Sequence, residues 1–71
     1  MKLVYWLSPL GDNDDFGDPY STGMIDGKTV HGPWANMTPA SWAKHGIGRL
    51  GQGYGQRYEK QSNGRWLKVE G

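Results

Sequence analysis

The first apolar run of the chain, residues 2–8, predicts a β-strand. Its Leu-Val-Tyr-Trp-Leu core is β-branched, aromatic and aliphatic, and Pro9 ends the run because proline cannot donate to a strand ladder. Apolar side chains fall on both faces, a pattern that is typical of a central strand covered on two sides. Since one short helix covers only one face of a sheet, we expect a loop or a binding partner over the other face.

A polar loop and a small hairpin follow this run. Residues 10–23 are rich in Asp, Asn, Gly and Pro, all of which favour turns. Residues 24–31 surround Asp26-Gly27, a dipeptide that favours a two-residue hairpin turn. We therefore expect two short strands here, joined at Asp26 and Gly27.

Residues 37–47 predict the one helix of the chain. Thr38 can cap the first turn with its hydroxyl, and Pro39 suits the first helical position. Gly46 is expected to end the helix with φ > 0, the usual conformation of the residue after the C-cap. The apolar residues that flank the two ends both reach Trp42, which is therefore predicted to pin the helix to the core.

The last hairpin, residues 56–70, carries the strongest turn signal of the chain at Asn63-Gly64. A two-residue turn at this dipeptide gathers apolar side chains on one face and opposite-charge pairs on the other, and it leaves Trp66 on the charged face. The predicted cross-strand pairs are Gln61–Trp66, Lys60–Leu67, Glu59–Lys68, Tyr58–Val69 and Arg57–Glu70. A three-residue Ser-Asn-Gly loop with a bulge is the competing arrangement.

Together these elements predict a single small α+β domain over residues 1–71. Its core is a mainly antiparallel sheet of four or five strands, with one short helix between the third and fourth strands. A chain of 71 residues is near the lower size limit for one hydrophobic core, and the absence of cysteine excludes disulfides and thiolate metal sites. Four Trp and four Tyr compensate, because each aromatic side chain buries a large area.

Charge is unevenly distributed along the chain. Residues 1–27 hold one lysine and five aspartates, a net charge of −4, whereas residues 28–71 hold seven lysines and arginines and two glutamates, a net charge of +5. Such an asymmetry indicates either oppositely charged faces of one domain or a charged partner. No apolar run has the length of a membrane span and none resembles a secretory signal, so we expect a cytoplasmic protein without membrane contact.

The motifs that suggest a cofactor or a metal do not complete their patterns. Residues 46–51 spell G-x-G-x-x-G, but a helix precedes them and a strand follows, which reverses the dinucleotide-binding order. The acidic stretch 12–18 departs from a calcium-binding loop at its fifth and twelfth positions, which favours a solvated turn. His31 and His45 are the two histidines, and two imidazoles alone do not form a transition-metal site, although carboxylates could complete one. We expect no cofactor and no metal.

Catalysis is not expected either. The sequence contains no nucleophile elbow, no helical metal motif and no local pair of carboxylates with separate roles. A chain of this size also has little room for a substrate pocket of the usual volume. The sequence therefore predicts a non-catalytic binding protein.

A basic and aromatic surface is the candidate site. Arginine and tyrosine are interleaved with the glycines of segment 46–55, and the outer face of the last hairpin adds a tryptophan. The predicted partner-binding residues are Arg49, Tyr54, Arg57 and Trp66, with Trp66 as the anchor and the arginines at the rim.

The same composition suits more than one class of partner. Tyr, Trp and Arg are enriched at protein interfaces, so we expect a protein partner first. Single-stranded nucleic acid is the alternative, because arginine neutralises phosphate and aromatic rings stack on bases. A structural subunit of a homo-oligomer is the third class. A compact, cysteine-free, Trp-rich chain also has the format of phage or mobile-element accessory proteins that inhibit a host machine.

Overall fold

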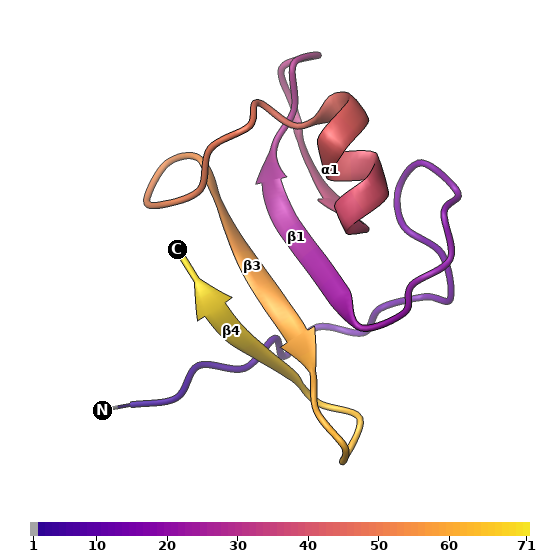
Figure 1. Ribbon diagram of the computed structural model, residues 1–71, viewed down its shortest axis with the longest axis vertical. Coiled ribbons are helices and arrows are strands. Elements are labelled where there is room, and N and C mark those ends of the chain that lie inside the picture. The colour runs from indigo at the N-terminus through magenta and orange to yellow at the C-terminus, as the bar shows by residue number, and fades with distance from the viewer. Residues whose placement is uncertain (1) are drawn as a thin grey trace.

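The computed structural model describes residues 2–71 and consists of a four-stranded antiparallel sheet with one short helix (Figure 1). The strands are β1 (Gly23–Lys28), β2 (Trp34–Met37), β3 (Gly55–Lys60) and β4 (Trp66–Glu70), in the spatial order β2-β1-β3-β4. The α+β character and the antiparallel sheet agree with the sequence. The predicted place of the helix is wrong: α1 (Pro39–His45) lies between the second and third strands, not between the third and fourth.

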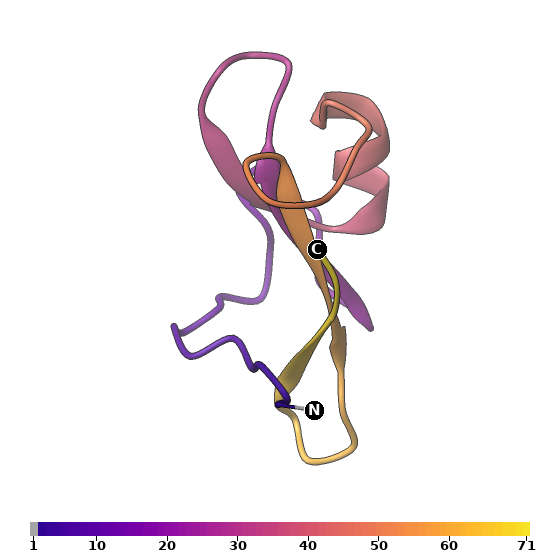
Figure 2. The ribbon, with the colours of Figure 1, turned by 90° about the vertical axis from the view of Figure 1, so that its left-hand side faces the viewer.

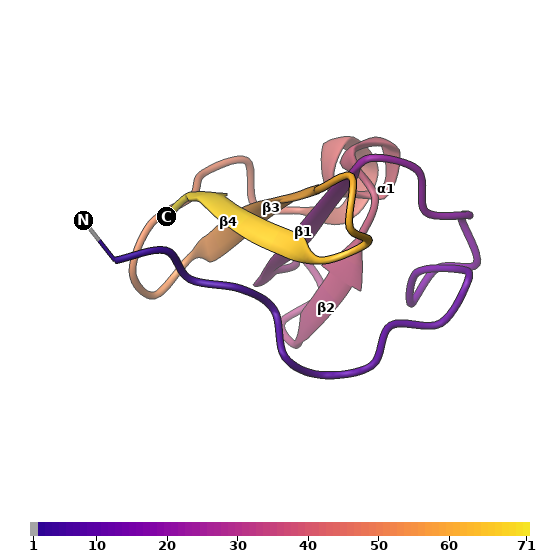
Figure 3. The ribbon, with the colours of Figure 1, turned by 90° about the horizontal axis from the view of Figure 1, so that it is seen from below.

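The N-terminal segment, residues 2–8, explains this difference because it is not a strand. It touches the sheet at its outer edge, through one bridge between Tyr5 and Leu67 and two backbone hydrogen bonds to β4. In these bonds the N–H of Trp6 donates to the Trp66 carbonyl at 2.9 Å, and the N–H of Lys68 donates to the Val4 carbonyl at 2.8 Å. Figure 3 shows the segment running beside β4, so only two strands precede the helix.

The first hairpin forms, but its turn is displaced from the predicted dipeptide. β1 runs straight through Asp26 and Gly27, and the chain reverses over residues 29–33, where the Thr29 hydroxyl donates to the Pro33 carbonyl at 2.7 Å. Gly27 has a packing role, because a Cβ at this position would lie 2.7 Å from Cζ3 of Trp42. Gly27, which the sequence suggested as a turn residue, is therefore required because the helix packs its Trp42 side chain directly against this position.

The helix begins as predicted and ends differently. Thr38 is the N-cap, its hydroxyl accepts from the N–H of Ser41 at 3.2 Å, and Pro39 occupies the first turn. Gly46 has φ −75° and ψ 159°, an extended conformation, so the predicted positive φ is wrong. A Cβ at Gly46 would lie 2.1 Å from Cε3 of Trp42. Trp42 therefore rests on two glycines, Gly27 and Gly46, which supports its role as the pin of the helix.

The two faces of the sheet have different covers (Figure 2). The helix packs on β1 and β2, and the N-terminal part of the chain crosses the opposite face. On that second face the Trp6 ring meets Tyr58 edge-on at 5.5 Å, and Tyr20 meets Trp66 at 5.9 Å. The fully buried large side chains are Met24, Ile25 and Met37. Of the two covers expected, a loop or a binding partner, the structure shows the chain itself: Trp6 of the N-terminal segment and Tyr20 of the following loop pack on this face.

The last hairpin adopts the competing register. Tyr58 pairs with Lys68, and the N–H of Gln61 donates to the Arg65 carbonyl at 2.7 Å around a Ser-Asn-Gly loop. Gly64 has φ 85°, whereas the predicted two-residue turn would also require a positive φ at Asn63, and no residue other than glycine has one within residues 2–71. A bulge between Arg57 and Tyr58 then restores one predicted pair, Arg57 with Glu70, and leaves Val69 without a partner on β3.

Within residues 2–71, the structure contains no helix with the length and apolar character needed to cross a membrane.

Candidate functional site

The acidic loop is a turn with mostly exposed residues, as predicted, but Asp14 also clamps it to the edge of the sheet. Asp14 is buried, with 7% of its surface exposed, and its Oδ1 accepts from the N–H groups of Phe16 at 2.9 Å and Asp18 at 2.8 Å. Its Oδ2 accepts from the N–H of Thr38 at 2.8 Å, which ties the loop to the start of α1. The Asp15 N–H donates to the Asn36 carbonyl and its carboxylate accepts from the Asn36 N–H, so the outer edge of β2 is covered at Asn36.

Hydrogen bonds to its carboxylate determine the direction in which the pKa of Asp14 is shifted. Burial alone would raise the pKa of Asp14, but hydrogen bonds from the Ser41 hydroxyl and from the N–H groups of Thr38, Asp18 and Phe16 outweigh it and lower the pKa. These carboxylate oxygens are occupied as acceptors. No group of three or more His, Asp or Glu side chains placed to hold a metal ion is found in the described part of the chain.

Asp26 shows the opposite behaviour on the second face of the sheet. Burial, followed by the charge of Asp15, raises the pKa of Asp26. A group with a raised pKa in the folded state contributes stability that is complete below its unfolded pKa, about 3.9, and is lost as the pH rises through the folded pKa. The ionised Asp26 carboxylate therefore destabilises the fold at neutral pH.

We expect Asp26→Asn to raise the melting temperature at about pH 7, because the amide keeps the shape of the side chain without its charge. The gain should shrink as the pH falls toward the unfolded pKa of the carboxyl group. Thermal unfolding of both proteins across the acidic range measures this dependence. Asp12→Asn, which removes the same charge from an exposed side chain, is the matched control, and an equal gain there would exclude burial as the cause.

The glycine-rich segment is an ordered turn that brings two of the predicted site residues together. Positive φ angles of 84° at Gly48, 123° at Gly51 and 84° at Gly53 reverse the chain between α1 and β3. The N–H of Gly51 donates to the Gly55 carbonyl at 2.8 Å. Arg49 places its guanidinium 4.1 Å from the centre of the Tyr54 ring, so these two residues form one contact.

The other two predicted site residues lie on opposite faces of the sheet. Arg57 pairs with Ile25 on the helix side, and its guanidinium binds Glu59 at 3.1 Å and Glu70 at 3.3 Å. Trp66 shares the second face with Tyr58 and is half-buried against Tyr20. Arg57 and Trp66 are therefore not parts of one surface, and their role in partner binding stays a prediction.

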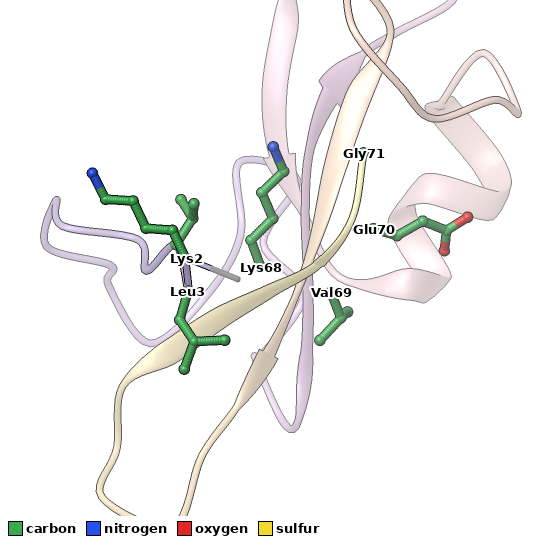
Figure 4. A pocket seen from close by; sticks show the side chains of 7 residues that line it. Lys2, Leu3, Lys68, Val69, Glu70 and Gly71 are labelled. Carbon is green, nitrogen blue, oxygen red and sulfur yellow. The ribbon is translucent and has the colours of Figure 1, made fainter.

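A cleft that the sequence did not indicate lies between the N-terminal segment and the end of β4 (Figure 4). It measures about 300 Å³ and is lined by residues 2–4 on one side and 68–71 on the other. Its apolar lining is unusually accessible, because Leu3 is 59% exposed, Val4 47% and Val69 39%. Exposed aliphatic side chains that gather in a hollow are typical of interaction sites.

The cleft forms because residues 2–4 and the end of β4 diverge from each other. The hydrogen bond from the Lys68 N–H to the Val4 carbonyl is the outermost backbone hydrogen bond between them, and Val69 lies directly beyond it at the bulge. The sequence-based prediction of a strand over residues 2–8 left no place for this cleft. A complete strand would form hydrogen bonds to its neighbour along its whole length. The one sequence feature that could have indicated the cleft is the apolar run 2–8, because no other element was predicted to cover both of its faces.

Positive charge flanks the cleft. Figure 4 shows the side chains of Lys2 and Lys68 extending to the same side, with Glu70 directed to the other side of β4. Within residues 2–71 both ion pairs belong to Arg57, one of them with Glu70, so neither lysine is paired. Glu70, which also lines the cleft, is paired with Arg57, so the unpaired side-chain charge of the lining is positive.

Comparisons with protein-family models, with curated proteins and with solved structures give no significant match to this chain.

Proposed function

We propose that this chain is a non-catalytic binding protein that holds an extended, acidic segment of a protein partner in the cleft between residues 2–4 and β4. The cleft itself carries the proposal, because it combines accessible Leu3, Val4 and Val69 with a charged rim. An extended segment suits a hollow that is bounded by two extended chains.

The charge and chemistry of the lining favour this partner over the alternatives. Two unpaired ammonium groups, on Lys2 and Lys68, favour carboxylates on the partner. The apolar lining is aliphatic, and it offers no aromatic face on which a nucleic-acid base could stack. The lining therefore favours a protein segment with aliphatic and acidic residues over single-stranded nucleic acid.

The test compares the proteins that wild type and two charge-reversal variants capture from the lysate of the native host. Lys68→Glu reverses a charge at the cleft, and Lys28→Glu reverses one on an exposed lysine at the end of β1. We expect a captured protein to be retained by wild type and by Lys28→Glu, and to bind Lys68→Glu about tenfold more weakly, since that ratio corresponds to ~1.4 kcal/mol. Quantitative mass spectrometry and a binding isotherm with the captured protein measure the ratio.

A second pair of variants tests the apolar part of the cleft. Leu3→Asp changes a residue of the lining, whereas Leu7→Asp makes the same change on an exposed leucine of the same segment that does not line the cleft. Only Leu3→Asp should release the partner, and both variants should keep the wild-type melting temperature.

Three outcomes would contradict the proposal. Capture that disappears after nuclease treatment, with steep salt dependence, would identify nucleic acid. Loss of the partner on Trp66→Ala but not on Lys68→Glu, with an unchanged melting temperature, would move the site to the aromatic surface predicted from the sequence. A mass that rises with concentration and is insensitive to Lys68→Glu would identify a homo-oligomer built through another surface.

A further inference from the structure

The two histidines, 14 residues apart in the sequence, meet in the structure. His31 lies in the turn between β1 and β2, and His45 is the last residue of α1. Nε2 of His31 lies 3.1 Å from Nδ1 of His45, so in the neutral pair one ring nitrogen donates and the other accepts. Neither residue lines the cleft described above.

Backbone hydrogen bonds fix the separation of the two rings. The N–H of Val30 donates to the His45 carbonyl at 2.8 Å, and the N–H of Ile47 donates to the Lys28 carbonyl at 3.1 Å. These bonds lie on either side of the Thr29–Gly46 bridge and hold the hairpin against the end of the helix next to the histidine pair. The two imidazoles are therefore held close together by the fold, without any ligand.

A third ring orients His45. Phe16, from the loop that Asp14 clamps, stacks on the His45 imidazole with 4.0 Å between ring centres and 8° between ring planes. The same phenyl ring lies 6.5 Å from that of His31. Phe16 covers one face of His45 and leaves the ring edge, with its nitrogens, available.

We propose that His31 Nε2 and His45 Nδ1 together chelate one divalent transition-metal ion. Two nitrogens bound to one ion at ~2.0–2.1 Å lie roughly 2.9–3.4 Å apart for coordination angles between about 90° and 110°. The observed 3.1 Å falls within this range. Both rings must pivot so that their lone pairs converge on the ion, which the partial exposure of the two side chains permits.

Binding requires one tautomer change and no redox step. The proton that the pair shares must leave the nitrogen that carries it, and the same ring takes up a proton at its other nitrogen, so both metal-facing nitrogens become acceptors. Two imidazoles fill two coordination positions, and water fills the others. Neutral imidazole ligands favour late first-row ions, so the expected order of affinity is Cu²⁺ above Ni²⁺ and Zn²⁺.

The proposal departs from the sequence-based expectation of no metal at these residues. Two imidazoles do not make a closed site, but two rings that the fold holds 3.1 Å apart can make an open, bidentate one after they pivot. The ion would link the β1–β2 turn to the end of α1, so it should stabilise the fold, because a ligand that binds the native state raises its stability.

The test uses tag-free protein with Cu²⁺, Ni²⁺ and Zn²⁺ salts, and with a chelator as the metal-free reference. Calorimetric titration should give one ion per chain, and the imidazole ¹⁵N resonances of both histidines should shift with Zn²⁺. His31→Gln and His45→Gln should each weaken binding roughly tenfold or more, since removing one ligand of a chelate also removes its effective concentration.

The melting temperature provides a separate readout, taken for each variant relative to its own metal-free value. This reference keeps the test valid for His45→Gln, which also loses the stacking on Phe16. The metal-induced rise should be present in wild type and absent in both variants. Equal affinity in wild type and in either single variant would overturn the proposal, as would resonance shifts confined to one histidine.

Discussion

Replacing Trp42 with alanine should lower the free energy of unfolding by about 3–5 kcal/mol. The indole lies on Gly27 and Gly46 and joins α1 to β1, so its removal leaves a cavity that flanking backbone cannot fill. A domain of 71 residues has a total stability of roughly 4–10 kcal/mol, so this change removes much of it. Urea unfolding measures the difference, and a Trp42→Ala curve that overlays wild type would show that the helix is not pinned by this residue.

A double-mutant cycle tests whether position 46 requires glycine because of the Trp42 indole. Gly46→Ala should destabilise wild type by about 1–3 kcal/mol, because its Cβ would overlap the indole. In a Trp42→Leu background, which keeps more stability than alanine, the same change should have little effect, since the extended conformation of Gly46 suits any residue. Equal effects in both backgrounds would exclude the indole contact as the reason for glycine.

Asp14→Ala should lower the free energy of unfolding by about 2–4 kcal/mol at neutral pH. The substitution leaves the buried N–H of Thr38 and the part-buried N–H groups of Phe16 and Asp18 without this acceptor, and hydrogen bonds to charged groups contribute ~1.5–3 kcal/mol each. Because the pKa of Asp14 is lowered by folding, its contribution is present above the unfolded pKa of about 3.9 and is lost as the pH falls through the folded pKa.

Urea unfolding of wild type and Asp14→Ala, at neutral pH and in acid, checks both the size and the sign. The difference between the two proteins should shrink as the pH is lowered. Asp12→Ala, in the same loop but exposed, should change stability only slightly. A difference that persists unchanged at low pH would show that the Asp14 carboxylate does not act through its charge.

Local signals predicted the helix because its start is encoded locally. A hydroxyl cap at Thr38 and a proline at position 39 act within one turn, and both are found in the structure. The end of the helix was predicted at the right residue for the wrong reason. Gly27 is a glycine because of the Trp42 indole, which is remote from it in the sequence, and no local pattern distinguishes such a glycine from a turn residue. Gly46 meets the same indole from one helical turn away, but its glycine was interpreted as a requirement for positive φ.

The errors in the sheet have a related origin. The Asn63-Gly64 dipeptide suits both a two-residue turn and a three-residue loop with glycine at the positive φ, and the choice between them shifts every cross-strand pair. The apolar run 2–8 has the composition of a central strand, but composition does not determine how many of its residues pair with a neighbouring strand. In the structure it forms a single bridge, between Tyr5 and Leu67. The cleft depends on where that pairing stops, so the sequence could not place it.

The hydrogen bonds from the acidic loop to the edge of β2 affect whether two copies of the chain can pair through this edge. An uncovered edge strand offers a row of unpaired backbone groups that can template pairing with another chain. Here Asp14 and Asp15 occupy the groups of Asn36 and Thr38, and half-exposed Trp34 lies at the start of the same strand. Because folding lowers the pKa of Asp14, we expect strong acid to protonate its carboxylate and weaken its bond to Thr38, which would leave this end of the β2 edge more accessible to pairing with another chain.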